Sequence, residues 1–340
     1  MTPSPARKST IKQVAERAAV SIKTVSRVLN NERYISDDVR HRVEQAIREL
    51  AFQPSQAARA LAGKRSHQVA LICDNPSPYY VYEMQSGVRA QCLEANVRMI
   101  AQPYDRNSVD LRHQIEQLID QTNPDGLILT PPITDFDDVI DMLQQRRLKY
   151  VCISPAKLST KCSAVFIDNL AAAQALVAYL ISLGHRRIGF IGGHPSYATS
   201  AQRRSGYRRA LELAGIELDT RMEVQGEYDF RSGADGAAQL LALGDRPTAI
   251  FASSDDMAAG ALATAHRLGL NVPGQLSIAG FDDTALAEVV WPPLTTIRQP
   301  TRELAYTATG LLLNRPEPVE HLEIPFELIL RQSTAARLNG

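Results

Sequence analysis

The chain has 340 residues, and its 37 Lys and Arg are balanced by 37 Asp and Glu, so its formal net charge is zero. This length predicts two or three domains at roughly 100–200 residues each, and 44% hydrophobic residues exclude a wholly disordered or fibrous chain. Neutrality also argues against a nucleic-acid binder, because such domains are usually basic.

The charges are unevenly distributed along the chain. Residues 1–65 carry 13 Lys and Arg against 6 Asp and Glu, a net charge of +7, and the remaining residues carry 24 against 31, a net charge of −7. Such asymmetry points to contact with nucleic acid or a membrane surface, although a solvated basic face would give the same count. The first residues lack the apolar core of a signal peptide, and no apolar stretch approaches the ~18 residues of a membrane span. We therefore expect a cytoplasmic protein without membrane contact.

The basic segment is predicted to form three short helices. Thr10 and Gln13 match a capping box, Ser21 offers an N-cap for a second helix, and a third is expected to begin at Ser36. This arrangement is typical of a helix-turn-helix whose second helix enters the DNA major groove, and a small helical cap domain fits the periodicity equally well. The expected apolar faces are Ile11, Val14, Ala15 and Ala18, then Val25, Val28 and Leu29, then Val39, Val43, Ala46, Ile47 and Leu50.

The segment from Thr10 onward reads TIKQVAERAAVSIKTVSRVLN and contains the specific string VS-x-x-TVSRVLN. It closely resembles the N-terminal region of the lactose/galactose repressor family. The resemblance continues along the chain through DGLIL, LGHRRIGFIGG, SSDDMAAGAL, LSIAGFDD and PLTTIRQP. It implies a ligand-responsive, DNA-binding transcriptional regulator that acts as a homodimer on a palindromic operator.

The resemblance also implies which residues contact DNA. Ile22, Lys23 and Arg27 occupy the base-reading positions, on the side of the second helix away from its apolar face. Arg27 can bond a guanine edge in bidentate fashion, Lys23 can reach a guanine or a phosphate, and Ile22 offers apolar contact. Ala19 stands where the family often has a glycine, so we expect the turn to be made without a positive φ. The residues expected to contact phosphates and fix the register are Thr10, Ser21, Thr24, Ser26 and Asn30.

Residues 55–66 are predicted to contain a conditional hinge helix. The Ala-rich sequence favours helix, but a segment of about ten residues is too short to hold a helix alone in water. In the family, this helix pairs with that of the dimer mate in the DNA minor groove. The resemblance makes Leu61 the wedge that opens the central base step and Ala58 the small residue at the helix–helix contact. Ser55 replaces the more usual asparagine, and a Leu61 docked on the body is the alternative.

Beyond residue 67, short apolar stretches alternate with helical ones. The alternation predicts parallel, doubly wound sheets, and its two cycles predict two similar lobes that share a cleft. The resemblance specifies a type I periplasmic-binding-protein-like fold whose chain crosses between the lobes three times. The expected strands are 69–73, 98–101, 126–130, 150–153, 164–167, 187–191, 222–225, 248–252 and 276–279, and the expected helices include 82–94, 170–183 and 257–268.

These expectations give an α/β fold class with a three-helix head, a hinge helix and a two-lobed body. The boundaries are 9–54 for the helix-turn-helix domain, 55–66 for the hinge helix and linker, and 67–336 for the effector-binding and dimerisation domain. The first lobe takes about 67–168 and 301–328, and the second takes about 169–298 and 329–336.

Polar side chains follow several expected strands and should face the cleft. They lie in the pairs Asp74-Asn75, Asp168-Asn169 and Asp282-Asp283 and in the run 253–256. A sugar needs convergent carboxylates, amides and Arg around its hydroxyl groups, together with an aromatic or apolar face against its C–H groups.

The family pattern assigns effector contacts to individual residues. Arg203, four positions before Tyr207, is the clamping arginine, and Asp282 is the matching hydroxyl-binding carboxylate. Ser254 stands where the family usually has asparagine, so the identity of the ligand cannot be copied. The other residues assigned to polar contacts or flat walls are Asn75, Tyr79, Tyr80, Asp168, Tyr228, Phe230 and Gln299.

Some residues have a plainer interpretation. Asp256 can serve either purpose, and Tyr80 can be a core residue. The four cysteines form no C-x-x-C pair, and each sits in or beside an apolar run, so buried thiols are expected at Cys73, Cys92, Cys152 and Cys162. Bracing, hydrogen-bonding or packing roles are expected for Asp255, Asp283, His185 and Trp291.

Three classes of function are compared. The leading hypothesis is a homodimeric repressor of carbohydrate uptake or catabolism genes, released from its operator by a mono- or oligosaccharide. A co-repressor-dependent regulator with a purine or other small effector is the alternative, because the sequence does not fix the sign of the response. A solute-binding protein would need a signal peptide and no basic head. An enzyme is disfavoured because the G-x-G-x-x-G, P-loop, H-E-x-x-H and nucleophile-elbow motifs are missing, and no cofactor or metal is expected.

Overall fold

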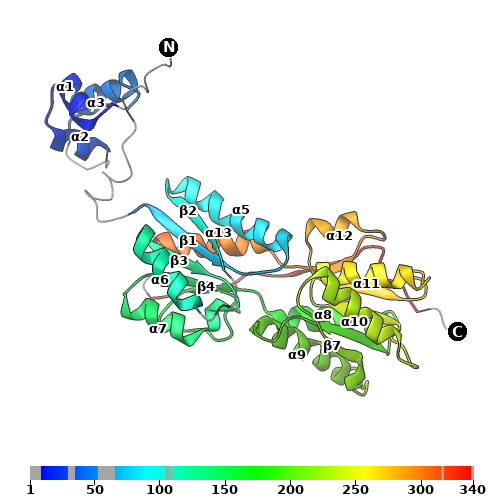
Figure 1. Cartoon of the computed structure of the whole chain (residues 1–340). Coiled ribbons are helices and arrows are strands. Elements are labelled where there is room, and N and C mark those ends of the chain that lie inside the picture. Colours follow the sequence, from blue (N-terminus) through cyan, green and yellow to red (C-terminus); the bar gives the residue numbers. More distant parts are fainter. Residues whose placement is uncertain are drawn as a thin grey trace, which may run out of the picture. The chain divides into compact units, whose positions relative to one another are not determined.

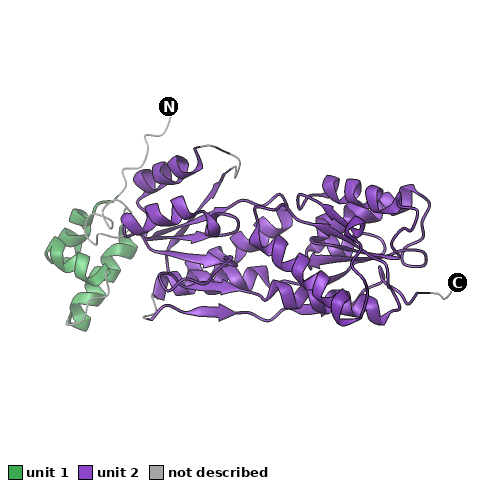
Figure 2. Ribbon diagram, turned by 90° about the horizontal axis from the view of Figure 1, so that it is seen from below, with its two compact units in different colours: residues 1–67 green, residues 68–340 purple. Residues whose placement is uncertain are grey.

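The structure is a computed structural model and describes residues 9–29, 35–52, 66–104, 108, 110–314 and 318–337. The expectations for Asn30, Ser55, Ala58 and Leu61 lie outside these residues. The chain divides into two compact units, residues 1–67 and residues 68–340 (Figure 2), and each is described by itself.

The first unit contains α1 (Ile11–Ala18), α2 (Ile22–Leu29) and α3 (Asp37–Glu49). The predicted capping box is present, since the Gln13 backbone N–H donates to Thr10 Oγ1 at 3.4 Å and the Thr10 N–H donates to Gln13 Oε1 at 2.8 Å. Ser21 caps α2 by accepting from the Thr24 N–H at 3.1 Å. Both N-caps predicted from the sequence are therefore confirmed.

The three helices bury one face each in a common core. Val14, Val25 and Val43 are fully buried there, and Ala15, Ala18, Val28, Ala46 and Phe52 complete it. Burying an aliphatic side chain of this kind contributes about 1.5–3 kcal/mol. The opposite side of α2 stays open to solvent, where the Ile22 side chain is 48% exposed. An exposed isoleucine beside an exposed Lys23 is thus a feature of the outer face of α2.

The turn between α1 and α2 corrects one expectation. Ala19 has φ 53° and ψ 47°, which is left-handed backbone, so the prediction of a turn without positive φ is wrong. The reversal after α1 requires this conformation, because it lets the Ala19 N–H reach Glu16 O at 3.3 Å and the Val20 N–H reach Ala15 O at 3.0 Å. These bonds satisfy carbonyls at the helix end and offset a cost of roughly 1–2 kcal/mol for a residue with a Cβ.

The second unit contains two six-stranded sheets (Figure 1). The first has the order β11-β5-β4-β3-β1-β2, and the second has the order β12-β10-β9-β8-β6-β7. Neighbouring strands are parallel, except that β12 is antiparallel to β10. The strands of the first sheet are β1 (Gln68–Cys73), β2 (Arg98–Pro103), β3 (Gly126–Leu129), β4 (Tyr150–Ile153), β5 (Ala164–Phe166) and β11 (His321–Glu323). Those of the second are β6 (Ile188–Gly192), β7 (Glu223–Gln225), β8 (Ala249–Ala252), β9 (Ser277–Asp282), β10 (Thr295–Arg298) and β12 (Glu327–Ile329).

Helices cover both faces of each sheet, as the doubly wound pattern requires. In the first lobe, α5 and α13 share one core with the sheet, and α6 and α7 pack on the other face. Figure 1 shows α5 beside α13 although they are far apart in the sequence. In the second lobe, α8 and α9 cover one face, and α10 and α11 cover the other. The helices are α5 (Pro78–Glu94), α6 (Leu111–Thr122), α7 (Asp137–Gln145), α8 (Asn169–Ser182), α9 (Ala198–Leu213), α10 (Phe230–Leu241), α11 (Asp255–Arg267), α12 (Ala285–Val289) and α13 (Thr301–Asn314).

The chain crosses between the lobes three times, which confirms the predicted topology. The crossings lie between β5 and α8, between β10 and α13, and between β11 and β12. The sequence did not predict β10, β11 or β12. In the second sheet, β12 begins at Glu327, next to the boundary of about 328 that the sequence predicts for the first lobe.

Candidate functional site

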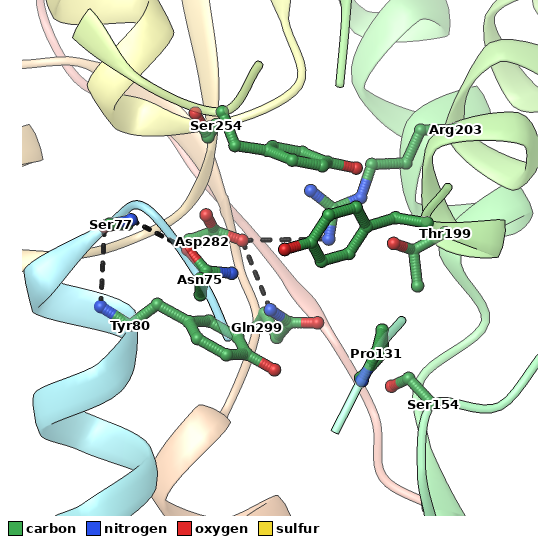
Figure 3. A pocket seen from close by; sticks show the side chains of 12 residues that line it. Asn75, Ser77, Tyr80, Pro131, Ser154, Thr199, Arg203, Ser254, Asp282 and Gln299 are labelled. Atoms are coloured by element: carbon green, nitrogen blue, oxygen red, sulfur yellow. Dashed lines mark hydrogen bonds and ion pairs between the residues drawn. The ribbon is translucent and has the colours of Figure 1, made fainter. Parts of the chain in front are cut away.

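The cleft between the two sheets is formed by loops that follow the carboxyl ends of parallel strands, where doubly wound folds bind ligands. It contains a partly open cavity of about 30 Å³, which is room for about two water molecules. Figure 3 shows side chains from both lobes converging on it. The lining residues are Asn75, Ser77, Tyr80, Pro131, Ser154, Tyr197, Thr199, Arg203, Tyr228, Ser254, Asp282 and Gln299.

Arg203 projects from α9 into the cleft and is only 4% exposed. Its Nε donates to Asn169 Oδ1 at 2.9 Å, and its Nη1 donates to the Ser253 carbonyl at 2.6 Å. The guanidinium carbon lies 3.6 Å from the centroid of the Phe281 ring. These contacts fix the planar fork and leave Nη2 directed at Asp282, 3.7 Å from Oδ1. A rigid fork held in this way suits bidentate recognition of oxygen atoms.

Asp282 ends β9 with a φ of 110°, and Asp283 follows with a φ of 52°. Such backbone is rare for residues with a Cβ and costs of order 1–3 kcal/mol where it occurs. The Asp282 carboxylate lines the cavity and accepts from Gln299 Nε2 at 3.2 Å. Burial raises the pKa of Asp282 to about 7, although the Arg203 guanidinium lowers it, and the Asp256 carboxylate raises it further.

Three tyrosines form the aromatic part of the cleft. Tyr197 and Tyr228 meet edge to face, with ring centroids 5.2 Å apart, and Tyr80 lines the cavity from α5 in the first lobe. Gly193 is required beneath Tyr228, because a Cβ at position 193 would lie 1.9 Å from the Tyr228 Cζ. The cavity therefore combines a buried charged pair with flat apolar surfaces, the two elements that a sugar or another small polyol needs.

Two hydrogen bonds join the lobes at the cleft. Ser77 Oγ donates to Asp256 Oδ2 at 2.6 Å, and the Tyr197 hydroxyl donates to the Asp74 carbonyl at 3.0 Å. Ser77 caps α5 in the first lobe, and Asp256 lies in the first turn of α11 in the second. Asp256, ambiguous in the sequence, thus contacts the opposite lobe, and burial raises its pKa. These bonds link the two lobes across the cleft.

The structure brings most of the expected effector residues together: Asn75, Tyr80, Arg203, Tyr228, Ser254, Asp282 and Gln299 all line the cavity. It does not bring Tyr79, Asp168 or Phe230 there. Tyr79 precedes Tyr80 on α5 and points about 100° away around the helix. Asp168 is exposed and caps α8 by accepting from the Ala171 N–H. Phe230 is 50% exposed at the first residue of α10 and does not line the cavity.

The sequence interpretation missed several lining residues: Ser77, Pro131, Ser154, Tyr197 and Thr199. All five follow the carboxyl end of a strand in the chain. Small polar and aromatic residues at every strand–loop junction are the signal that points to them, because ligands bind at the carboxyl ends of the strands. Acidic pairs and their neighbours mark only some of these junctions.

The plainer interpretations can also be checked. Asp255 is fully buried and accepts from the Thr284 N–H and hydroxyl and from the Thr296 hydroxyl, so it braces loops as expected. Asp283 does so through ion pairs with Arg298 and Arg331 at 2.7 Å each.

His185 and Trp291 differ in outcome. The His185 ring nitrogens lie 3.0 Å from Thr248 Oγ1 and 3.1 Å from Ser277 Oγ, which confirms a structural hydrogen-bonding role. Trp291 is 78% exposed, so the expected packing role is wrong within this chain. The four cysteines are buried free thiols, as predicted.

The residues that the structure describes contain no helix long and apolar enough to cross a membrane. Within the same residues, no group of three or more His, Cys, Asp or Glu is placed to hold a metal ion.

Comparison with known proteins decides the family. Residues 10–55 match the model of bacterial regulatory proteins, lacI family, and residues 177–334 match that of a periplasmic binding protein-like domain. The HTH-type transcriptional regulator DegA of Bacillus subtilis is 34% identical over 338 residues, covering 96% of this chain and 98% of DegA. The chain belongs to the lacI family of bacterial regulatory proteins.

Solved structures agree with this membership in the lacI family. The Lac repressor dimer bound to operator and the anti-inducer ONPF matches with a TM-score of 0.82 and 27% identity, covering 97% of this chain and all of that chain. The transcriptional regulator CelR in complex with cellobiose matches with a TM-score of 0.73 and 28% identity over 96% of this chain. The lacI-family chain is therefore a DNA-binding transcriptional regulator with a helix-turn-helix head and a periplasmic-binding-protein-like body.

Proposed function

We propose that the protein is a dimeric repressor that leaves its operator when a carbohydrate binds between the lobes of its body. The observation that carries this proposal is the buried Arg203–Asp282 pair, set among tyrosines in a cleft of a lacI-family chain. The similar CelR structure is a complex with cellobiose. The proposed site of action is the bacterial cytoplasm, where operator DNA lies.

On the DNA side, the proposal assigns base reading to Ile22, Lys23 and Arg27. Ile22 and Lys23 occupy the exposed face of α2, and Arg27 is half-buried beside them. The residues proposed to contact phosphates are Thr10, Ser21, Thr24, Ser26 and Asn30. Thr10 and Ser21 precede α1 and α2, where backbone N–H groups at the helix N-terminus favour anions. Phosphate contacts provide affinity, and base contacts provide specificity.

On the effector side, the proposed contacts are Asn75, Tyr80, Arg203, Tyr228, Ser254, Asp282 and Gln299. Binding between the lobes favours the closed arrangement only if the effector binds that arrangement better than the open one. The proposed dimer transmits the change in lobe orientation to the hinge segment 55–66, whose paired helices lose their packing and release DNA. Ser55 and Ala58 are proposed to lie in that hinge contact.

The proposal is tested with the purified full-length chain and a fluorescent operator found by binding-site selection. A thermal-shift screen of mono- and disaccharides and of nucleobases identifies ligands, and each hit is then titrated into the protein–DNA complex. We expect a carbohydrate to stabilise the protein and to lower operator affinity. A nucleobase that strengthens operator binding would replace this proposal with the co-repressor alternative, and a protein that selects no operator would refute the proposal.

Leu61 provides a test of the proposed hinge. If Leu61 wedges into the central base step, Leu61→Ala should weaken specific operator binding about 10- to 100-fold, as expected for a lost buried leucine contact. It should also reduce the bend angle of the operator, measured by fluorescence energy transfer between the DNA ends. Leu213→Ala, which removes a leucine 68% exposed on α9, is the matched control. An unchanged bend angle in Leu61→Ala would rule out the wedge.

The titration of Asp282 predicts how effector binding depends on pH. Because its pKa is about 7, the carboxylate that accepts sugar hydroxyls is mostly protonated at pH 6, and effector affinity should be roughly tenfold lower there than at pH 8. The free energy of unfolding should depend on pH in the opposite sense. Because the pKa of Asp282 is raised in the folded protein, Asp282 stabilises the fold at low pH, and this contribution is lost as the pH rises through 7.

Calorimetry between pH 5.5 and 8.5 measures the dependence of affinity on pH. Asp282→Asn should flatten the profile. Asp256, whose pKa is also raised by burial, is another titrating group at the cleft. A profile that flattens in Asp256→Asn but not in Asp282→Asn would show that the pH dependence comes from Asp256 and not from Asp282.

The Ser77–Asp256 bond predicts a second effect on closure. Ser77→Ala leaves the buried Asp256 Oδ2 without its donor, and losing a hydrogen bond to a charged group costs about 1.5–3 kcal/mol. We expect about a 10-fold loss of effector affinity and a larger radius of gyration by X-ray scattering. Ser205→Ala, at an exposed serine that bonds only its own helix, is the control. If Ser77→Ala and Ser205→Ala behave alike, the bond does not hold the lobes together.

A further inference from the structure

Two of the four cysteines lie in direct contact. Cys152 belongs to β4, Cys162 lies just before β5, and their sulfur atoms are 3.8 Å apart. The backbone fixes this neighbourhood, because the Cys152 N–H donates to the Ser163 carbonyl at 3.1 Å. Cys73 and Cys92 belong to the core on the opposite face of the same sheet.

The two thiols of the pair differ in access. Cys162 lines an open surface groove of about 450 Å³ and is 7% exposed, whereas Cys152 does not line the groove and is 2% exposed. Three cationic side chains, Arg147, Lys149 and Lys161, line the same groove. Because Cys162 lines the groove and Cys152 does not, a reagent that enters the groove reaches Cys162 first.

The hydrogen bonds within the pair make the thiols chemically unequal. The pKa of Cys162 is lowered, because the Cys152 thiol and then Tyr150 donate to it, against the opposing effect of burial. The same contact and burial raise the pKa of Cys152. By contrast, burial raises the pKa of Cys73 and of Cys92 to about 11 each. A Cys162 sulfur beside the groove with the Cys152 sulfur directly behind it is the arrangement of an attacking and a resolving cysteine.

We propose that Cys152 and Cys162 form an oxidation site at which hydroperoxides produce an intramolecular disulfide. The Cys162 thiolate attacks one oxygen of hydrogen peroxide, the O–O bond breaks, and the leaving hydroxide takes a proton to become water. Cys162 is then a sulfenic acid. The Cys152 sulfur attacks the Cys162 sulfur, the S–S bond forms as the S–O bond breaks, and the Cys152 proton leaves with the hydroxyl group as water. Two thiols lose two electrons and two protons, and one peroxide is reduced to two waters.

The chain can accommodate the new bond. A disulfide needs its sulfur atoms about 2.05 Å apart, so the two sulfurs must approach by roughly 1.8 Å. Cys162 ends the loop that follows β4, whose residues 156–158, 160 and 161 are exposed. This surface loop can yield, while Cys152 stays in its strand. The closed ring then spans residues 152–162, a short loop on one edge of the first sheet.

Trypsin separates all four thiols and makes the test direct. Cleavage after Lys and Arg places Cys152 in peptide 150–157, Cys162 in 162–186, Cys73 in 66–89 and Cys92 in 90–98. The full-length protein is treated with hydrogen peroxide, its remaining thiols are alkylated, and the digest is measured by mass spectrometry without reductant. We expect a linked pair of 150–157 with 162–186, reversed by dithiothreitol, while 66–89 and 90–98 remain alkylated.

Variants separate the two steps. Cys152→Ser should stop at a sulfenic acid on Cys162 that dimedone traps, and Cys162→Ser should leave Cys152 unoxidised. Cys92→Ser leaves the pair intact and is the control for a serine in the core. Without peroxide, iodoacetamide should alkylate Cys162 faster than Cys92 at pH 7.5, because Cys162 lines the groove and its pKa is lowered, whereas burial raises the pKa of Cys92 to about 11.

Three outcomes would overturn the proposal. The first is the absence of the linked peptide pair at peroxide concentrations that already oxidise Cys73 or Cys92. The second is a disulfide that joins two chains instead of Cys152 and Cys162 within one. The third is equal alkylation rates at Cys162 and Cys92. Circular dichroism of each serine variant checks that a negative result does not come from an unfolded protein.

Discussion

Arg203→Ala is expected to keep operator binding and to abolish the response to effector. The change removes the fork held by Asn169 and the Ser253 carbonyl and leaves Asp282 buried without its counter-charge. Arg203 and Asp282 form a buried ion pair at 3.7 Å, and truncating one partner of a close buried charge pair costs about 2–5 kcal/mol in binding. We therefore expect the effector concentration for half-release of the operator to rise by about 100-fold or more, measured by fluorescence anisotropy of labelled DNA.

The controls for Arg203 lie on the same helix. Arg208→Ala removes an arginine of α9 that is 49% exposed and pairs with Glu223 outside the cleft, so it should release DNA as the parent does. Arg203→Lys keeps the charge but not the planar fork, and an intermediate loss is expected. A folded Arg203→Ala that no longer binds operator, or one that responds normally to effector, would show that Arg203 does not clamp the ligand.

Replacing the exposed pair Ile22 and Lys23 on α2 is expected to change the preferred operator. Glutamine at position 22 introduces an amide that can bond adenine N6 and N7, and alanine at position 23 removes a cation. Each good base contact is worth about 1–3 kcal/mol of discrimination. Binding-site selection with Ile22→Gln/Lys23→Ala should return a different half-site, with the parent operator bound about 10- to 100-fold more weakly.

Lys12 offers a matched cation in the same head. It lies on α1, is 76% exposed and pairs only loosely with Glu16 at 4.0 Å. Lys12→Ala should leave the selected consensus unchanged, even if it lowers affinity through the loss of one positive charge. A consensus that stays the same in the α2 variant, or that shifts equally in Lys12→Ala, would contradict the assignment of base reading to α2.

The sequence predicted the fold well, because the fold depends on strong local signals. Capping residues such as Thr10 and Ser21 predicted where the helices start. Short apolar strands alternating with helices predicted parallel, doubly wound sheets. The strands β10 to β12 escaped prediction although β5 and β7 are equally short, because β11 and β12 follow α13 without a helix between them and so lie outside the alternation of strands and helices. The conformation of Ala19 was not predicted either. A positive φ at a residue with a Cβ is stable only where hydrogen bonds offset its cost, and these bonds exist only in the folded turn.

The candidate site was predicted less completely. Arg203 and Asp282 were expected to act as a pair, and they do lie together, but the resemblance to a family supplied that expectation and periodicity did not. Tyr197 and Ser77 were missed because their importance depends on what the opposite lobe places across from them. Asp168 was expected in the cleft from its position after a strand and from the family resemblance, and Phe230 from the resemblance alone, but Asp168 caps α8 and the exposed Phe230 begins α10. Contacts between distant segments are the part that a linear pattern does not encode.

The position of the cavity between the lobes also sets the time course of the response. Tyr80 lines it from the first lobe and Arg203 from the second, so a ligand that contacts both side chains enters and leaves only while the lobes are parted. The observed association rate should therefore level off at high ligand concentration, at the rate of opening, and the same opening step should limit dissociation. In a cell that exhausts its sugar, the regulated genes would then be repressed again after a delay set by the rate at which the cleft opens. This delay would not depend on the affinity of the open cleft for the ligand.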